Sequence, residues 1–148
     1  MMAGKYHNSN SFTLIELIII LVIVTVIGMI SVPRVTTGIE TMKFRENVTE
    51  FITFLRKSHL DAILDRKDVN VIADLERNIL ERDDGKLFHL PPEIVLEPKD
   101  PDSYKIAKYL FFYNGRGSGP EMFLIGSNEK KALIYIDSLS GLARCSFN

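Results

Sequence analysis

The strongest constraint on this chain is an apolar run near its start. From Phe12 to Val32 the sequence has 21 residues, and Glu16 is the only formally charged one. At about 1.5 Å of rise per residue, such a helix spans roughly 30 Å, which is enough to cross a bilayer. A carboxylate there costs about 2.5–3.5 kcal/mol at the membrane centre, so an acid in this setting is usually paired or functional. The run therefore predicts a transmembrane helix over residues 12–33, with Glu16 as a functional acid.

The residues before the run, 1–11, are polar and carry one lysine and no acid. Together with the α-amino group they place positive charge on the cytoplasmic side, so we expect a cytoplasmic leader peptide. A secretory signal peptide is one alternative, but its apolar core normally has 7–15 residues and ends in an Ala-x-Ala site. No alanine occurs between Phe12 and Arg34. A plain signal anchor is the second alternative, which composition alone does not exclude.

The order Phe12-Thr13-Leu14-Ile15-Glu16, directly after a polar leader, favours a third interpretation. It resembles the cleavage and methylation site of type IV prepilins and of the pseudopilins of type II secretion. The resemblance implies that Ser11 is the last leader residue and that Phe12 becomes the methylated N-terminus. It also implies that Glu16 is the acid used in assembly. Ser11 departs from the glycine that is usual in the family, and this departure bears on the efficiency of cleavage.

An acid at this position of the helix has a physical use. After cleavage Phe12 would carry an ammonium at the helix N-terminus, where the macrodipole already adds about +0.5 charge. In an apolar filament core that positive end needs an anion, which Glu16 of a neighbouring subunit can supply. A pair within one chain competes for the same carboxylate, because helical side chains tilt toward the N-terminus.

Two residues further along predict a weak or kinked section of the helix. Pro33 falls where many pilins carry a helix-kinking proline, and Gly28 lowers the helix propensity five residues earlier. The simpler interpretation is that Pro33 marks the membrane exit. Both interpretations are compatible with one another.

Residues 34–148 predict one globular domain, which the resemblance places in the periplasm. An apolar stripe at three- and four-residue steps continues the helix to about Asp65. Runs rich in β-branched and aromatic residues then predict strands, with a hairpin turning at Asp83-Asp84-Gly85. The predicted fold class is α+β, with a long N-terminal helix packed on an antiparallel β-sheet in a pilin-like manner. In this prediction the helix has a membrane half and an amphipathic half.

The C-terminal order narrows the resemblance. An aromatic strand enters the glycine-rich run 115–119, and the chain closes with a strand, Asp137, a turn at Gly141 and a last strand. This order resembles the H-class minor pseudopilins of type II secretion and the related FimT-type minor pilins. It implies a minor pseudopilin, a structural subunit of a pseudopilus that helps to export folded proteins across the outer membrane. The implied partners are other pseudopilins or pilins, a prepilin peptidase, the inner-membrane assembly platform and the bacterial inner membrane itself.

The sequence has no catalytic constellation and no cofactor motif. The glycine-rich run lacks the Lys-Ser/Thr ending of a phosphate loop and leads into a strand. No second metal ligand stands three or four residues from His59, so we expect a hydrogen-bonded packing histidine there. The single cysteine, Cys145, cannot form an internal disulfide. We therefore predict a protein that is not an enzyme and that uses neither a metal nor a cofactor.

An uneven charge distribution gives an alternative function. Residues 34–102 carry 11 basic and 15 acidic side chains, a net of −4, whereas residues 103–148 carry six and three, a net of +3. The alternative is a minor type IV pilin that binds DNA for uptake or supports pilus assembly. Its candidate DNA contacts are Lys130, Lys131 and Arg144. An ordinary solvated surface explains so modest an excess more simply, and nucleic acid is not expected as a partner. A membrane-anchored sensor or adhesin would need Phe12 and Glu16 to be accidental.

Overall fold

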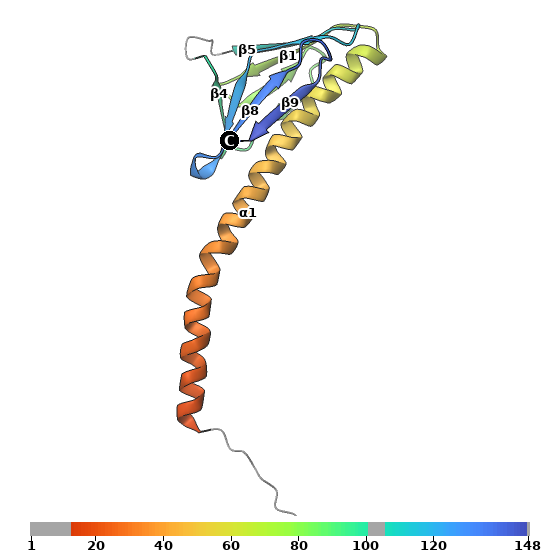
Figure 1. Ribbon diagram of the computed structural model, residues 1–148. Helices are drawn as coiled ribbons and strands as arrows, with labels where there is room; N and C mark the ends of the chain where they lie inside the picture. The colour runs from red at the N-terminus through yellow and green to blue at the C-terminus, as the bar shows by residue number, and fades with distance from the viewer. Residues whose placement is uncertain (1–12, 101–105, 148) are drawn as a thin grey trace, which may run out of the picture. The chain divides into compact units, whose positions relative to one another are not determined.

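The computed structural model describes residues 13–100 and 106–147, without the side chains of residues 30–37 and 128. Within these residues a single long helix, α1 (Leu14–Leu64), precedes nine strands, and the short 3-10 helix η1 (Ser127–Glu129) lies between two of them (Figure 1). The strands are β1 (Val69–Asp74), β2 (Ile79–Arg82), β3 (Leu87–His89), β4 (Val95–Pro98), β5 (Ile106–Phe111), β6 (Gly117–Ser118), β7 (Met122–Ile125), β8 (Lys131–Ile136) and β9 (Ala143–Phe147). The chain divides into two compact units, Met1–Ile39 and Glu40–Asn148, and the boundary falls inside α1.

The strands of Glu40–Asn148 form two antiparallel sheets. The first sheet has the order β3-β2-β1-β5-β6, and the second sheet has the order β4-β7-β8-β9. The chain changes sheet three times, because β4 interrupts the first sheet and β7 to β9 return to the second. Every strand pair in the described part is antiparallel.

The predicted fold class is wrong in two respects. The strands form two separate sheets and not the one sheet that was expected. In addition, the described part of the chain contains no helix that is both long enough and apolar enough to cross a membrane. The predicted membrane half of the helix is therefore not found there. The strand patterns did not predict a second sheet, because period-two alternation indicates a strand without identifying the strand that it pairs with.

Local sequence explains the individual elements well. Buried and outward-facing residues alternate along β1, β5 and β8, as period-two strands require. The predicted hairpin is confirmed, since β2 pairs with β3 across the turn that contains Gly85 (φ 84°). The helix ends at Leu64, next to the predicted Asp65. The two-residue strand β6 lies inside the glycine-rich run, where only a turn was expected.

Helix α1 packs on both sheets with its residues from Phe44 onward. Phe51 lies edge-on to Phe88 of β3, with ring centroids 6.3 Å apart. Phe44 makes a similar contact with Phe147 of β9, also at 6.3 Å. Val48, Phe51 and Leu55, at three- and four-residue steps, have no exposed surface. One face of the helix therefore supplies core to both sheets.

A junction at His59 joins the helix to two turns. The buried His59 ring donates from Nε2 to the carbonyl oxygen of Gly115, at 3.0 Å, in the β5–β6 turn. Gly141, in the β8–β9 turn, has φ 65°, and a Cβ there would lie 2.4 Å from the same Nε2. His59 thus has the hydrogen-bonded packing role predicted for it. Close packing against the helix explains the glycine at Gly141, whereas the positive φ of 84° explains the glycine at Gly115.

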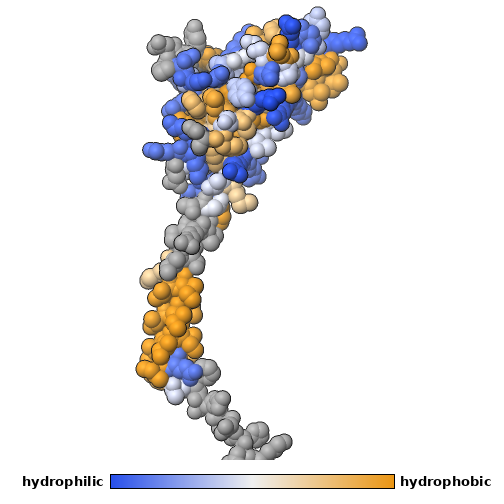
Figure 2. All heavy atoms as spheres, viewed as in Figure 1, coloured by the Kyte–Doolittle hydropathy of each residue, from blue (hydrophilic) through white to orange (hydrophobic). Residues whose placement is uncertain are grey.

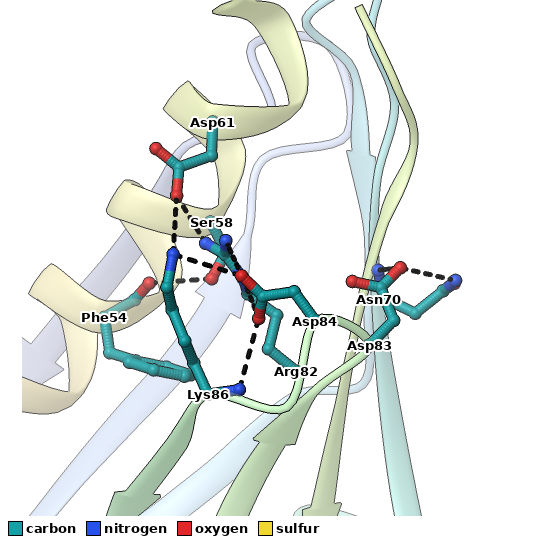
Figure 3. A network of polar contacts seen from close by, with 8 residues as sticks. All are labelled: Phe54, Ser58, Asp61, Asn70, Arg82, Asp83, Asp84 and Lys86. Carbon is teal, nitrogen blue, oxygen red and sulfur yellow. Dashed lines mark hydrogen bonds and ion pairs between the residues drawn. The ribbon is translucent and has the colours of Figure 1, made fainter. Parts of the chain in front are cut away.

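A second link joins α1 to the β2–β3 hairpin through the buried guanidinium of Arg82 (Figure 3). Arg82 Nη1 lies 2.5 Å from Asp61 Oδ2 on the helix, and Nε lies 2.8 Å from Asp84 Oδ1 in the turn. Nη2 also bonds the second oxygen of Asp84, which makes this pair bidentate. Lys86 Nζ adds a contact with Asp84 at 3.1 Å. The hydrogen bonds from Arg82 hold the pKa of Asp84 well below its usual range, and those carboxylates raise the pKa of Arg82.

We expect Gly141→Ala to destabilise the fold much more than Gly85→Ala. Both glycines have positive φ, which costs a side chain about 1–2 kcal/mol, but a Cβ at Gly85 meets nothing within 4 Å. At Gly141 the added carbon must also displace His59 or Gly115, and such overpacking typically costs a further 1–3 kcal/mol. Urea unfolding of the full chain in mild detergent, followed by circular dichroism, measures the difference. Equal losses would show that the His59 junction is not tightly packed.

Asp84→Asn should lower stability at neutral pH and flatten its acid dependence. Because the pKa of Asp84 is depressed in the folded chain, its contribution is complete above the ordinary Asp pKa of about 3.9 and is lost as pH falls further. The gap between the variant and the wild type should therefore shrink as the pH is lowered from about 5. Unfolding curves at several pH values test this. Glu50→Gln is the control, because Glu50 is exposed on α1 and forms no ion pair with the described residues. A gap that does not change with pH would contradict the prediction.

Candidate functional site

Apart from the exposed Glu16 in its first turn, the helical segment Leu14–Met29, the first part of α1, is apolar on all its sides. Thirteen large apolar side chains are exposed along it, from 45% for Ile20 to 77% for Leu14. Figure 2 shows this segment as an almost unbroken orange column. Its one threonine, Thr25, donates its hydroxyl hydrogen to the carbonyl oxygen of Leu21 at 2.7 Å, so it offers no outward polar stripe. A helix that is hydrophobic all round is normally covered by other protein or by lipid.

The start of this helix is capped by Thr13. The backbone N–H of Glu16 donates to the carbonyl oxygen of Thr13 at 3.0 Å and has a longer contact with its hydroxyl Oγ1 at 3.4 Å. Leu17 N–H then donates to the same carbonyl at 3.3 Å and begins the regular helical pattern. Thr13 is thus the N-cap, and Glu16 is the third helical residue, in the Thr-x-x-Glu order of a capping box.

The contact of Thr13 with the backbone N–H of Glu16 is a local structural feature that the sequence analysis missed. The signal was present, because Thr13 and Glu16 have the required spacing directly before an apolar run. An acid in the first turn also interacts favourably with the helix macrodipole. The exposed carboxylate of Glu16 can therefore serve the helix start within its own chain as well as a partner.

The other residues predicted for processing and bending have these places. Ser11 and Phe12 lie outside the described residues, so cleavage and methylation there stay predictions. Gly28 lies within α1, and nothing lies within 4 Å of the position of a Cβ. Pro33 falls within the bounds of α1, and its side chain is outside the described part. The predicted kink between these two residues stays a prediction.

The three candidate DNA contacts do not converge. Lys131 is exposed at the start of β8, whereas Arg144 of β9 lies opposite Tyr135, four residues further along the strand or about 13 Å away. The guanidinium of Arg144 is 3.8 Å from the Asp137 carboxylate, which neutralises part of its charge. The ammonium of Lys130 is buried, with no hydrogen-bond partner in the described part of the chain. The three cations thus form no continuous exposed patch.

We also searched the described residues for a metal site and for a reactive cysteine. Residues 13–100 and 106–147 contain no group of three or more histidine, cysteine, aspartate or glutamate side chains that could hold a metal ion. Cys145 is exposed on β9 as a free thiol. The Leu14–Met29 segment, with its capped start and its acid, is therefore the candidate functional site.

Known proteins give no further guide to this site. No family model, curated protein or solved structure matches the chain. The function is therefore inferred from the residues of the chain and from the geometry of Thr13, Glu16 and the apolar segment that follows them.

Proposed function

We propose that the chain is a minor pseudopilin, a non-enzymatic structural subunit of a type II secretion pseudopilus that helps to export folded proteins across the outer membrane. One observation carries the proposal. A helical segment that is apolar on all sides, Leu14–Met29, begins with a capped Thr13-x-x-Glu16 turn directly after Phe12. The order of residues is the one that resembles prepilins, and the exposure of the segment gives it a reason to assemble.

The size of the apolar surface supports assembly with several neighbours. Thirteen large apolar side chains are exposed by 45% or more. Burying the exposed half of each contributes about 1 kcal/mol, so the whole segment contributes on the order of 10 kcal/mol. Association of two proteins costs an estimated 4–15 kcal/mol in lost translational and rotational freedom. A contact that covers only one face of the helix contributes a part of the segment's total, which barely offsets this cost. Several helices around each segment, as in a filament core, would cover all its faces.

Glu16 has a specific task in this proposal. Cleavage before Phe12 leaves an ammonium at the start of the helix, close to the positive end of the macrodipole. When subunits bury this end, a carboxylate from a neighbour compensates its charge and fixes the axial offset between the two chains. Loss of one partner of a buried pair is costly, about 3–5 kcal/mol, so the pairing also selects correctly placed subunits.

The proposed function implies a location and partners. The precursor would lie at the bacterial inner membrane with its N-terminus in the cytoplasm and residues 34–148 in the periplasm. A prepilin peptidase would process it, and the assembly platform would add it to other pseudopilins. DNA uptake has no comparable support, because Lys130 is buried at its ammonium and Arg144 lies beside Asp137.

The first test of the proposal is the mature N-terminus. We expect a prepilin peptidase to cleave between Ser11 and Phe12, so that mass spectrometry of the mature chain finds N-methyl-Phe first. Ser11→Gly should be processed at least as well as the wild type, because glycine is the usual family residue there. A mature chain that begins at Met1, or near Ser31, would overturn the proposal.

The second test separates the charge of Glu16 from its place in the capping box. Glu16→Gln retains the size and hydrogen-bonding capacity of a capping residue but removes the charge, whereas Glu16→Leu removes both. We expect both variants to be cleaved, and both to fail to enter pseudopili and to support secretion, because the neighbouring ammonium loses its partner. Crosslinking between subunits in cells measures the incorporation. Normal assembly of Glu16→Gln, with failure of Glu16→Leu, would assign Glu16 to capping alone and refute the charge pairing.

A further inference from the structure

Exposed apolar side chains gather at the end of the Glu40–Asn148 unit where α1 finishes. Three segments meet there, namely the last turns of α1, the β5–β6 turn and the β8–β9 turn. Six of their large apolar side chains are exposed by between 38% and 82%, and we call them the tip patch: Leu60, Ile63, Leu64, Tyr113, Leu139 and Leu142. Figure 2 shows apolar atoms gathered over this end of α1. An apolar patch of this kind on a folded domain marks an interaction surface.

Short contacts between the three segments hold the tip patch together. Ile63 Cδ1 lies 3.8 Å from the position of a Cβ at Gly115, and a Cβ at Gly141 would lie 2.6 Å from the Gly115 carbonyl oxygen. The backbone N–H of Tyr113 donates to Asp68 Oδ1, just beyond the helix, at 3.0 Å. The three segments thus form one continuous surface, and its apolar side chains are not scattered singly over the domain.

Basic side chains surround the tip patch. Four exposed ones form no ion pair with the described residues: Lys57, Arg66, Lys67 and Arg116. Most of the nearby acids are engaged, since Asp68 and Asp137 accept backbone hydrogen bonds and Asp61 pairs with Arg82. Asp65 is a further exposed acid at the end of the helix. Residues 56–68, 112–117 and 137–144 together carry six basic and four acidic side chains, so the surroundings of the tip patch are positive.

We propose that the tip patch docks on an anionic lipid surface. Its leucine, isoleucine and tyrosine side chains enter the boundary between headgroups and acyl chains, while the surrounding lysines and arginines keep their charges among the headgroups. Charge complementarity selects an anionic surface, because such a surface attracts each basic side chain that comes near it.

The shape of the tip patch also favours lipid over a protein partner. Leu139 projects from the β8–β9 turn with 82% of its surface exposed, and the other members of the tip patch lie on two further segments. A protein partner must match the contour of all three segments to pack as densely as a protein interior. Lipid headgroups and acyl chains rearrange around projecting side chains, so they need no such match.

Co-flotation of the full chain with vesicles tests the docking. The chain is held in nanodiscs of phosphatidylcholine and mixed with vesicles made either of phosphatidylcholine alone or of equal parts phosphatidylcholine and phosphatidylglycerol. We expect the nanodiscs to float with the anionic vesicles and not with the neutral ones, and added salt should release them. Empty nanodiscs show how much of the flotation comes from the discs themselves.

Two variants test the two parts of the docking surface. Leu139→Ser removes an apolar side chain from the lipid boundary and should weaken binding to the anionic vesicles roughly tenfold. Lys67→Gln removes one charge and should weaken it about fivefold. Their matched controls are Ile106→Ser, at the opposite end of β5 from the β5–β6 turn, and Lys131→Gln, at the opposite end of β8 from the β8–β9 turn. All four side chains are exposed, and circular dichroism checks that each variant folds.

The proposal is supported if binding needs anionic lipid and is weakened by both tip variants and by neither control. Equal binding to neutral vesicles, or anionic binding that both tip variants retain, would overturn it. Self-association of the wild-type chain that Leu139→Ser abolishes, without any binding to vesicles, would also overturn it and would assign the tip patch to a contact between proteins. None of these results depends on cleavage before Phe12 or on the pairing of Glu16, so failure of the docking leaves the proposed function untouched.

Discussion

The two sheets of Glu40–Asn148 share no strand in the described structure, so the packing of α1 on both of them holds the unit together. Phe44 touches Phe147 of the second sheet, and Phe51 touches Phe88 of the first. Arg56 Nε donates to the carbonyl oxygen of Ala143 at 3.0 Å and so adds a polar link to β9. Loss of the buried helix face would remove a layer that covers apolar side chains of both sheets, and a sheet needs a second layer to be stable.

The same helix has two different surfaces along its length. From Phe44 onward one face is buried and the opposite face is charged, which is the usual pattern for a helix packed on its own domain. From Leu17 to Met29 the large side chains are apolar in every direction and exposed. Folding of the single chain buries the apolar face from Phe44 onward. It leaves the apolar surface of Leu14–Met29 exposed. The proposed filament would give this second surface a partner, and in that proposal Glu16 would set the register of the contact.

Several glycines of the C-terminal region lie so close to buried side chains that a larger residue would not fit, and this packing explains them without a ligand site. A Cβ at Gly119 would lie 2.2 Å from the ring of Tyr109, and one at Gly126 would lie 2.4 Å from the ring of Phe44. Together with Gly141 beside His59, these positions let turns of both sheets contact buried rings and the helix. Tight packing of this kind makes the fold sensitive to single added carbons, because protein interiors have few voids.

The sequence by itself determined the features that depend on neighbours along the chain. The extent of the amphipathic helix, the β2–β3 hairpin and the packing role of His59 followed from apolar spacing, turn residues and the lack of a second ligand. The N-cap at Thr13 was equally local and could have been predicted from the Thr-x-x-Glu spacing before an apolar run. Whether Phe12 is processed and Glu16 pairs with a neighbour depends on other proteins, which neither the sequence nor the fold of one chain contains.

Only the tertiary structure decided how the strands divide into two sheets and which side chains meet across them. Residues 21 apart in the sequence, Asp61 and Arg82, form an ion pair, and His59 reaches Gly115 in a turn 56 residues away. The tertiary structure also separated Lys130, Lys131 and Arg144, which the net positive charge of residues 103–148 had suggested as one basic surface. Alternation along a strand reports which face is buried, but hydrogen bonding between strands is the same for every partner. The choice of partner is therefore made by the packing of the whole domain, which no local pattern records.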